Sequence, residues 1–362
     1  MTGIYVGKFF PLHNGHINCI NSLIKICDKV YVVFYNNPLK EAKLNQELSY
    51  SIDERIMDAK EIFKNDNVEI VNYNVNPNLI FPKDYLKIKE EILNVVGIEK
   101  FDIQVFGQEE EEIYKNYIYA DRYIAEPLLL LPDNKSFHAT LVRNNYLKYR
   151  KYLPEIVRNR LDKKYANKII ICVSGKSGSG KSTLSKYILD EYDNSIHIDI
   201  DKLAHQALED EYTKKKVIEI TSNSILDESN KIDRRKLGNI VFNNKQLQDK
   251  VYNQTWIYMN SIIKKHISNR DNLIIILDWY NIVNKEEYWN ERNIKIITNR
   301  EYNTRKEYVI ARDNITEDYF ELREKNALTY DELKIDLVIN MEDNKRNIMD
   351  KIDNLFEKSI KN

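Results

Sequence analysis

The sequence has little of what marks several large classes of protein. Its 362 residues include only three cysteines (Cys19, Cys27 and Cys172), which lie far apart and form no CxxC pair. This usage argues against a disulfide framework or a structural zinc site, and it indicates a reducing, cytoplasmic environment. The net charge is −1, so no excess of positive charge favours nucleic acid or an anionic membrane as a partner.

Long apolar runs are also missing. No stretch approaches the roughly 18 uninterrupted apolar residues of a membrane-spanning helix. The first residues, MTGIYVGKFFPLH, show no basic segment followed by an apolar one, so we expect no signal peptide. With 43% hydrophobic and 31% charged residues, the composition is typical of a globular protein with an ordinary core.

The distribution of proline and tryptophan divides the chain. All seven prolines lie at or before Pro154, and all three tryptophans lie at or after Trp256. Together with the charged segment at 158–168, this break predicts one domain over residues 1–160 and a second over residues 168–362. The length fits about two domains of ordinary size.

Both halves alternate short apolar runs with segments of helical spacing. The runs expected to form strands are 3–7, 29–35, 68–75, 101–107 and 127–131 in the first half, and 168–175, 195–200, 272–280, 294–298 and 336–340 in the second. This alternation predicts two α/β domains, each a doubly wound parallel sheet covered by helices. Such sheets bind ligands at the carboxyl ends of their strands.

The segment GKSGSGKST at 175–183 follows one of these runs and precedes a helical segment. That context and spacing predict a phosphate-binding P-loop, whose backbone N–H groups cradle phosphates. We expect Lys181 to reach the transferred phosphoryl group and Ser182 to hold Mg²⁺. The predicted ATP contacts of the loop are Gly175, Gly178, Ser179, Gly180, Lys181, Ser182 and Thr183.

Two carboxylates, Asp199 and Asp201, end the next predicted strand. Residues at i and i+2 of a strand point to the same side. We expect Asp201 to take the proton of an acceptor hydroxyl and Asp199 to assist with Mg²⁺. Asp201 also precedes an apolar helical pattern, so it is suited to cap that helix.

From about Lys168 to Glu357 the sequence resembles the dephospho-CoA kinase family. The resemblance rests on the P-loop, DIDKLAH at 199–205, IDRRKLGNIVF at 232–242 and ARDNITEDYFELREKN at 311–326. It implies a kinase in which Asp201 is the general base and late arginines form a lid over the phosphates, here Arg305, Arg312 and Arg323. The chain departs from the family at Asp278-Trp-Tyr-Asn and Thr255-Trp-Ile, near the family's acceptor site. The resemblance therefore implies ATP as the donor and leaves the acceptor open.

The first half opens with GKFFPLHNGH at 7–16. His13 and His16 bracket Gly15 at an expected helix start, where imidazole N–H donors suit an anionic, pentavalent phosphoryl transition state. We expect His13, His16 and Lys8 to be catalytic, and Gly7 and Gly15 to let the backbone approach a phosphate closely. This motif is the signature of the nucleotidylyltransferase superfamily, whose second motif is similar to HATLVR at 138–143. There Thr140 is expected to cap a helix, and Arg143 to reach the ATP phosphates.

Within that superfamily, residues 3–158 resemble the NMN adenylyltransferase half of the bifunctional NMN adenylyltransferase/ribosylnicotinamide kinase. The features are GKFFPLHNGH, SIDERIMDAKEIF at 51–63 and FHATLVRNNYLKYRKYLPEIV at 137–157. Phosphopantetheine adenylyltransferases usually carry threonine at the position of His13, which argues against the CoA branch for this half.

Three functions remain open. In the first, the kinase phosphorylates a nucleoside or nucleotide hydroxyl, and the adenylyltransferase joins AMP to an NMN-like acceptor, forming NAD and pyrophosphate. In the second, the chain resembles CoA synthase and acts on phosphopantetheine and then dephospho-CoA. In the third, it senses nucleotides without catalysis, although the intact catalytic set argues against this. We favour the first for the adenylyltransferase. The expected cofactors are ATP and Mg²⁺, and the expected partners are small molecules; the oligomeric state is open.

Overall fold

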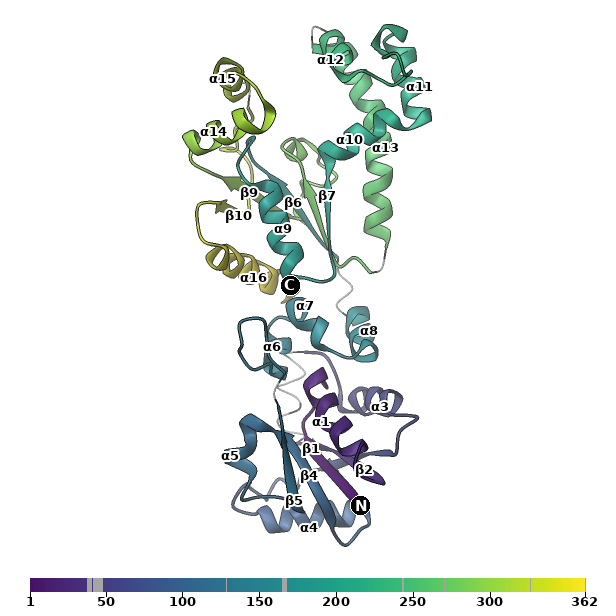
Figure 1. The fold of residues 1–362 in the computed structure, drawn as a ribbon, viewed down its shortest axis with the longest axis vertical. Coiled ribbons are helices and arrows are strands. Elements are labelled where there is room, and N and C mark those ends of the chain that lie inside the picture. Colours follow the sequence, from purple (N-terminus) through teal and green to yellow (C-terminus); the bar gives the residue numbers. More distant parts are fainter. Residues whose placement is uncertain are drawn as a thin grey trace. The chain divides into compact units, whose positions relative to one another are not determined.

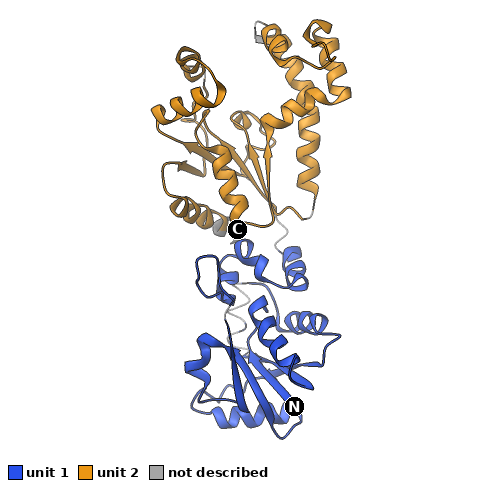
Figure 2. Cartoon of the chain, viewed as in Figure 1, with its two compact units in different colours: residues 1–166 blue, residues 167–362 orange. Residues whose placement is uncertain are grey.

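The computed structural model describes residues 1–37, 41, 48–127, 129–164, 168–242, 244–269, 271–325 and 327–361. The chain separates into two compact units, Met1–Ala166 and Asn167–Asn362 (Figure 2). Each unit contains its own sheet and is described by itself.

The sheet of the first unit has five parallel strands in the order β3-β2-β1-β4-β5. The strands are β1 (Thr2–Gly7), β2 (Lys29–Asn36), β3 (Val68–Asn74), β4 (Phe101–Gly107) and β5 (Ala120–Glu126). The helices are α1 (Asn14–Ile24), α3 (Ile52–Ile62), α4 (Tyr85–Val96), α5 (Glu111–Tyr114), α6 (Ala139–Asn144), α7 (Tyr146–Tyr149) and α8 (Glu155–Lys164), with 3₁₀ turns η1 (Gln108–Glu110) and η2 (Arg150–Tyr152).

The fifth strand was predicted at the wrong place. The apolar run at 127–131 contains Leu128, which lies outside the described residues, and its other residues form no strand beyond one isolated bridge from Leu130 to Ser136. The strand is instead β5, with the sequence ADRYIAE. It pairs only with β4, at the edge of the sheet. An edge strand tolerates exposed polar residues, so its pattern lacks the continuous apolar run of a central strand.

Local sequence signals place the helices of this unit. Helix α3 begins with a capping box, in which the Ser51 hydroxyl accepts from the Glu54 N–H and the Glu54 carboxylate accepts from the Ser51 N–H. Helix α4 ends at Gly97, whose positive φ of 79° forms a left-handed cap. Helix α4 then packs Ile88 and Ile92 into a core with the strands, so local signals and burial agree.

The sheet of the second unit also has five parallel strands, in the order β10-β9-β6-β8-β7. They are β6 (Ile169–Ser174), β7 (Ser195–Asp199), β8 (Ile274–Asp278), β9 (Ile294–Asn299) and β10 (Leu337–Asn340). The helices are α9 (Lys181–Glu191), α10 (Ile200–Glu209), α11 (Glu211–Ile220), α12 (Arg234–Phe242), α13 (Lys245–Ser268), α14 (Tyr302–Asp313), α15 (Glu317–Lys325) and α16 (Lys345–Lys361), with turns η3 (Asn223–Ile225) and η4 (Ile282–Asn284).

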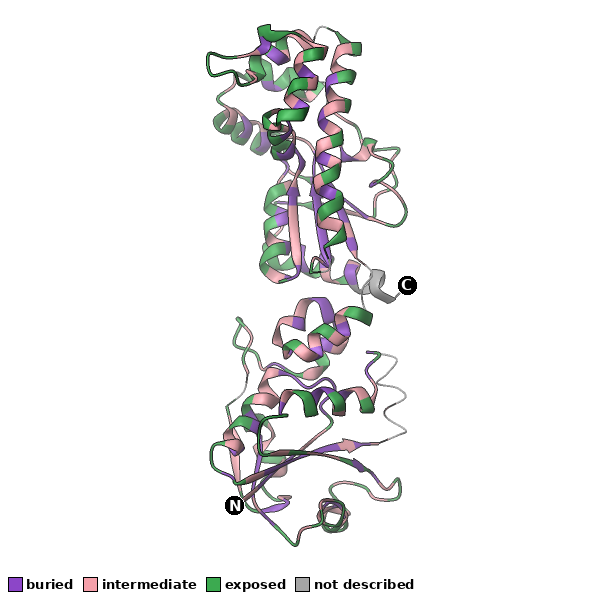
Figure 3. Ribbon diagram, turned by 90° about the vertical axis from the view of Figure 1, so that its right-hand side faces the viewer, coloured by how far each residue is buried: buried purple, intermediate pink, exposed green. Residues whose placement is uncertain are grey.

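Burial explains why β6 and β8 read as continuous apolar runs. They are central in the sheet, and β8 is buried at every residue. Figure 3 shows buried residues along the strands of both units. Helices α11 to α13 form a separate small core around Val217, Leu237 and Val251, and they group with α10 beyond the end of β7 (Figure 1). The predicted fold class, two parallel-sheet α/β domains, is confirmed. No helix in the described part of the chain is long and apolar enough to cross a membrane.

Candidate active sites

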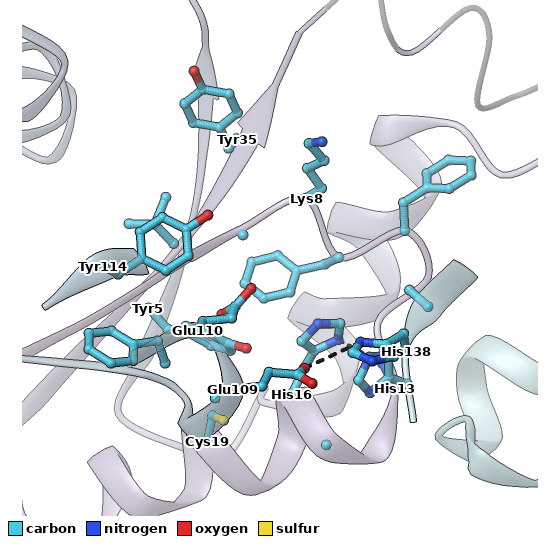
Figure 4. Close-up of a pocket in the computed structure, with 18 of the residues that line it drawn as sticks. Tyr5, Lys8, His13, His16, Cys19, Tyr35, Glu109, Glu110, Tyr114 and His138 are labelled. Atoms are coloured by element: carbon cyan, nitrogen blue, oxygen red, sulfur yellow. Dashed lines mark hydrogen bonds and ion pairs between the residues drawn. The ribbon is translucent and has the colours of Figure 1, made fainter. Parts of the chain in front are cut away.

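A cavity of about 740 Å³ opens at the carboxyl edge of the first sheet (Figure 4). Strands β1, β2 and β4 all end at this edge, and the loop after β1 carries the HxGH segment. The cavity is lined by all of the residues predicted for this site: Gly7, Lys8, His13, Gly15, His16, Thr140 and Arg143. The fold therefore brings together two distant parts of the sequence, residues 7–16 and 140–143.

The two histidines of the motif form a stacked pair. Their ring centroids lie 3.6 Å apart with 27° between the planes. The Nδ1 atom of His16 accepts from the backbone N–H of His13 at 3.2 Å. A neutral imidazole that accepts at Nδ1 carries its proton on Nε2, so His16 keeps one ring donor for a ligand.

Both imidazoles are held neutral. Burial, with a smaller contribution from the nearby His138, lowers the pKa of His13 to about 3. Burial also holds the pKa of His16 well below its ordinary value, with a smaller contribution from His13. The Nδ1 atom of His13 is buried and has no hydrogen-bond partner among the described residues. A buried orphan nitrogen in a cavity indicates a partner supplied by a ligand.

Gly15 is required by the way the histidines pack. A Cβ atom at this position would meet the His13 ring at 3.1 Å, which is tighter than ordinary side-chain contacts. Helix α1 begins immediately after His13, so the motif stands at a helix N-terminus as predicted. The positive end of the helix dipole therefore faces the cavity beside the two imidazoles.

Two guanidinium groups fix the loop between β1 and α1. Arg55 is almost fully buried and donates from Nη1 to the carbonyl oxygen of Lys8 at 2.6 Å. Arg143 donates from Nη1 to the carbonyl oxygen of Phe10 at 2.7 Å. Both guanidiniums also lie over the ring of Phe10. Between these anchors Phe9 has a φ of 47°, rare for a residue with a side chain. The loop that carries Lys8 is thus preformed.

Thr140 does not cap its helix, contrary to the expectation. Helix α6 begins after His138, which is its N-cap residue and makes no side-chain cap hydrogen bond. The Thr140 hydroxyl instead accepts from Nη2 of Arg143 at 2.9 Å, so it helps to orient this arginine within the cavity.

Aromatic rings and two carboxylates also line the cavity. Phe81 and Phe106 each contact Tyr114, with ring centroids 5.7 and 6.2 Å from that of Tyr114. Glu109 and Glu110 follow β4 in η1 and point into the cavity (Figure 4). Glu109 pairs with His138 at 3.3 Å. Burial raises the pKa of Glu110, and the charge of Glu109 raises it further. A cation bound here would relieve the repulsion between these carboxylates.

In the second unit, residues 175–180 form a tight loop between β6 and α9. A Cβ atom at Gly175 would lie 2.5 Å from the carbonyl oxygen of Thr298, and Gly175, Gly178 and Gly180 all have positive φ. These positions therefore require glycine. The Ser179 hydroxyl is buried and bonds the Thr298 hydroxyl at 2.7 Å, so this side chain stabilises the loop from beneath.

Lys181 turns back into the loop. Its Nζ donates to the carbonyl oxygen of Gly175 at 3.0 Å. Burial lowers the Lys181 pKa, and Asp278 and Asp201 oppose this by raising it. The ammonium group bonds a carbonyl oxygen of the loop, and it is positioned to bond phosphate oxygens in its place. Thr183, which was also predicted to contact ATP, is exposed on the first turn of α9.

Ser182 bonds a carboxylate that the sequence did not assign. Its hydroxyl donates to Oδ2 of Asp278 at 2.9 Å, and His197 Nε2 lies 3.1 Å from the same oxygen. Asp278 ends β8 and is 4% exposed. Hydroxyl and carboxylate oxygens are the hard donors that Mg²⁺ prefers. The described residues contain no cluster of three His, Cys, Asp or Glu able to hold a metal, so the other ligands would be phosphate oxygens and water.

The two aspartates after β7 have different positions. Strand β7 ends at Asp199, which is the N-cap of α10 and accepts from the Lys202 N–H at 3.0 Å. Asp201 lies in the first turn of α10. The expectations that both share one face of a strand and that Asp201 is the cap are therefore wrong, because the strand stops two residues earlier. The cap uses Asp199, and this leaves Asp201 to face Lys181.

The environment of Asp201 raises its pKa, chiefly through burial, while Lys181 opposes the shift. The residue is exposed to solvent overall, yet its carboxyl group lies in a recess among Lys181, Asp278 and Trp279. A carboxylate with a raised pKa is a better proton acceptor than an ordinary surface aspartate.

The three arginines predicted to form a lid differ in burial but share partners. Asp313 pairs with both Arg312 and Arg323, and Ser177 accepts from both Arg305 and Arg312. Arg305 is 4% exposed, forms a two-pronged pair with Glu324 at 2.8 and 2.7 Å, and donates to the carbonyl oxygen of Ser177 at 3.1 Å. Arg312 is about half exposed and donates to the Ser177 hydroxyl at 3.2 Å. Arg323 pairs with Asp313. Arg312 is therefore placed beside the loop opening, whereas Arg305 supports the loop from within the core.

The sequence of the second unit matches a known family over nearly its whole length. A family model described as dephospho-CoA kinase matches residues 169–349, half of the chain. The chain belongs to the dephospho-CoA kinase family. The first unit matches a second family model, described as cytidylyltransferase-like, over residues 4–145. The chain therefore joins a nucleotidyltransferase to a kinase, as the motifs predicted.

Curated relatives repeat this division. A dephospho-CoA kinase of Fusobacterium nucleatum is 29% identical over 192 residues, which cover 52% of this chain and 97% of that protein. A phosphopantetheine adenylyltransferase of Mycoplasma mycoides is 38% identical over 71 residues, 19% of this chain and 46% of that protein. Thus the chain spans less than half of this second relative.

Among solved structures, one described as NadR protein in complex with NR aligns over 99% of this chain and 86% of its own. Its TM-score is 0.36 at 16% sequence identity. This likeness is too low to carry an argument about function.

Asp278 is the functional candidate of the dephospho-CoA kinase unit that motif reading missed. Its signal was the apolar run NLIIIL that ends in a carboxylate. Since β6 and β8 are neighbours in the sheet, an acidic end of β8 lies beside the P-loop by topology. Strand order was needed to see this.

Proposed function

We propose that the first unit transfers the adenylyl group of ATP to nicotinamide mononucleotide, forming NAD and pyrophosphate. We propose that the second unit uses ATP to phosphorylate a hydroxyl of a nucleoside or nucleotide. The observation that carries the first assignment is the cavity itself, which combines neutral imidazole donors with aromatic rings and carboxylates.

The aromatic rings and carboxylates of the cavity favour a flat acceptor that carries a positive charge. Nicotinamide mononucleotide carries a pyridinium ring, which suits stacking on Phe106 or Tyr114 and attraction to the carboxylate of Glu110. Phosphopantetheine has neither a ring nor a cation, so it would leave this carboxylate without a counter-charge. Nicotinate mononucleotide has the same ring with an added carboxylate, which Glu109 and Glu110 would repel.

In the proposed adenylyl transfer, a phosphate oxygen of the acceptor attacks the α-phosphorus of ATP. The bond from the α-phosphorus to the bridging oxygen breaks, and pyrophosphate leaves. The nucleophile is already an anion, so no general base is needed. His16 donates from Nε2 to the oxygens that gain charge, and Lys8 and Arg143 stand at the cavity wall to balance the phosphates. Neutral imidazoles are suited to donate here because each still carries one N–H.

In the proposed kinase step, Asp201 accepts the proton of the acceptor hydroxyl as its oxygen attacks the γ-phosphorus of ATP. The bond to the bridging oxygen breaks, and ADP leaves. Lys181 moves from the carbonyl oxygen of Gly175 to the phosphates. Mg²⁺, when bound, would neutralise charge on the phosphates, and Ser182 and Asp278 are the residues that would hold it. Asp199 is a weaker candidate for holding Mg²⁺ because its carboxylate already caps α10.

The direct test measures pyrophosphate release from ATP with nicotinamide mononucleotide, nicotinate mononucleotide and 4′-phosphopantetheine. We expect release with nicotinamide mononucleotide. The variant Glu110→Gln should raise the KM for this acceptor about three- to tenfold, in keeping with roughly 1 kcal/mol for a cation near a partly buried carboxylate, and should leave the KM for ATP unchanged. The matched control is Glu112→Gln, since Glu112 is 83% exposed and pairs with Lys115.

The curated adenylyltransferase relative favours a second candidate, phosphopantetheine, which would make the chain an enzyme of CoA synthesis. Pyrophosphate release with 4′-phosphopantetheine alone would establish this candidate and overturn the first. In that case Glu110→Gln should change neither KM, because the acceptor brings no cation to the carboxylate.

A further inference from the structure

The two segments in which this chain departs from the dephospho-CoA kinase pattern meet in space. Tyr252 and Trp256, from α13, contact Trp279, which follows β8. The three ring centroids lie 5.9 to 6.3 Å from one another, and the planes are within 18° of parallel. We call these three side chains the aromatic platform. Trp279 is buried, whereas Tyr252 and Trp256 are partly exposed.

A positive charge lies over the aromatic platform. The Nζ atom of Lys285 is 4.0 Å from the ring centroid of Trp256 and 4.5 Å from that of Tyr252. Glu287 accepts from Nε1 of Trp256 at 3.0 Å, which places negative charge at the edge of this ring. Aromatic faces attract cations, most strongly on tryptophan, so the platform is an established cation position in this molecule.

The aromatic platform adjoins the reacting groups of the kinase. Trp279 directly follows Asp278, and its indole donates a hydrogen bond to the carboxylate of Asp201. The Tyr252 hydroxyl is buried and has no hydrogen-bond partner among the described residues. Its neighbours Tyr280 and Glu287 influence its ionisation without bonding it. A buried orphan hydroxyl on a ring that contacts Trp279 indicates a polar group that arrives with the acceptor.

We propose that the aromatic platform binds the flat, positively charged base of a pyridinium nucleoside, and that Lys285 occupies the place of this base when no acceptor is bound. This inference rests on the proposed kinase activity and names its acceptor. A pyridinium ring replaces the ammonium group and restores the same cation–aromatic attraction while adding stacking area. A neutral purine would have to displace the lysine without replacing its charge. The carboxamide of the ring offers an acceptor to the Tyr252 hydroxyl.

The proposal also connects the two proposed reactions. Phosphorylation of a pyridinium nucleoside gives a mononucleotide with a cationic ring. This is the class of acceptor that the carboxylates of the first cavity favour. Both acceptor ends would then recognise the same ring by the same chemistry.

The test uses the full-length protein and measures ADP formation with ribosylnicotinamide and, separately, with dephospho-CoA. We expect phosphorylation of ribosylnicotinamide. The decisive variant is Lys285→Ala, which removes the competing cation and should lower the KM for ribosylnicotinamide severalfold. Dephospho-CoA carries phosphates that would pair with Lys285, so an acceptor of that kind would bind more weakly to the variant. A raised KM in Lys285→Ala, or phosphorylation of dephospho-CoA alone, would overturn the inference.

A second variant tests the platform. Trp256→Ala should raise the KM for ribosylnicotinamide about five- to a hundredfold, the effect of losing one stacked base contact, with little change in the KM for ATP. Trp256→Phe keeps a ring and should recover most of the affinity. The control is Ile257→Ala, whose side chain is 59% exposed on the same helix. An unchanged acceptor KM in Trp256→Ala would also overturn the inference. In each of these failures, pyrophosphate release from ATP and nicotinamide mononucleotide would leave the proposed function of the first unit in place.

Discussion

Arg305 supports the P-loop of the second unit and forms a buried ion pair. Removing its charge tests whether this arginine stabilises the loop or acts on the phosphates during the reaction. The guanidinium forms a two-pronged pair with Glu324, and the side chains are 5% and 11% exposed. It also donates to the carbonyl oxygen of Ser177 within the loop. The pair with Arg305 is the main reason that the pKa of Glu324 is lowered. The proposed perturbation is Arg305→Met, which keeps the bulk of the side chain and removes its charge.

The expected cost follows from burial. Removing one partner of a buried pair leaves the other charge uncompensated, which costs about 3–5 kcal/mol. Lys176 also contacts Glu324, at 3.2 Å, but its side chain is 37% exposed, so solvent screens this contact and it recovers little of the loss. Against a typical unfolding free energy of about 5–15 kcal/mol, Arg305→Met should be strongly destabilising.

Tryptophan fluorescence isolates the unit concerned. All three tryptophans (Trp256, Trp279 and Trp289) belong to the second unit, so denaturant unfolding followed by this signal reports on that unit. The double variant Arg305→Met/Glu324→Leu removes both charges and should recover most of the lost stability. It should keep a raised KM for ATP, because the bond to Ser177 is still missing. The control is Arg323→Met: Arg323 is 41% exposed, so its loss should cost at most about 1 kcal/mol.

The opposite result would support the lid role that the sequence suggested. Suppose that the free energy of unfolding of Arg305→Met lies within about 1 kcal/mol of the wild-type value while its kinase kcat is lower. The guanidinium then acts on the phosphates during the reaction and does not stabilise the loop before it. If the double variant is as unstable as the single one, the charge pair is not the source of the stability.

Three further outcomes are expected. His16→Ala should abolish pyrophosphate release and spare ADP formation, and Lys181→Ala should do the reverse; loss of both activities in either variant would show that the sites depend on one another. Asp278→Asn should lower kinase kcat about ten- to a hundredfold, the worth of a charge-assisted hydrogen bond, and an unchanged kcat would remove Asp278 from the site. The pKa of His13 is about 3 in the folded chain against an ordinary 6.5, so the unfolded chain binds more protons between these values. The free energy of unfolding should therefore fall by about 1.4 kcal/mol per pH unit as the pH drops from about 6.5 towards 3. Hydrogen exchange of β1 and β2 should show a shallower fall in His13→Asn, and equal slopes in the two proteins would contradict the neutral burial of this imidazole.

Central strands and glycine turns were readable from the sequence because one physical cause dominates each. A strand such as β8 is buried on both faces, so it is apolar up to Asp278 at its carboxyl end. Gly175 must be glycine because the Thr298 carbonyl leaves no room for a Cβ atom. Edge strand β5 was misplaced because only one neighbour constrains it. Its polar residues meet solvent, and no continuous apolar pattern results.

The catalytic motifs were readable for a similar reason, but the partners of their residues were not. His13 and His16 are close in sequence, so their stacking follows from one helix start. The bond from Ser182 to Asp278 joins residues 96 positions apart. It depends on β6 and β8 being neighbours, which is a property of the sheet order and not of either segment. The same holds for Arg305, whose sequence position resembles a lid while its burial makes it a support.

The departures from the dephospho-CoA kinase pattern illustrate the same distinction at the acceptor site. Read separately, the segments at 255–257 and 278–281 look like unrelated losses of a family motif. In space Trp256 and Trp279 lie 5.9 Å apart and share one cation-bearing surface. Two changes that compensate in one place are better explained by a changed ligand than by decay, because decay has no reason to align two indole rings within 15° beside the carboxylate of Asp201. The proposed pyridinium acceptor therefore accounts for both departures at once.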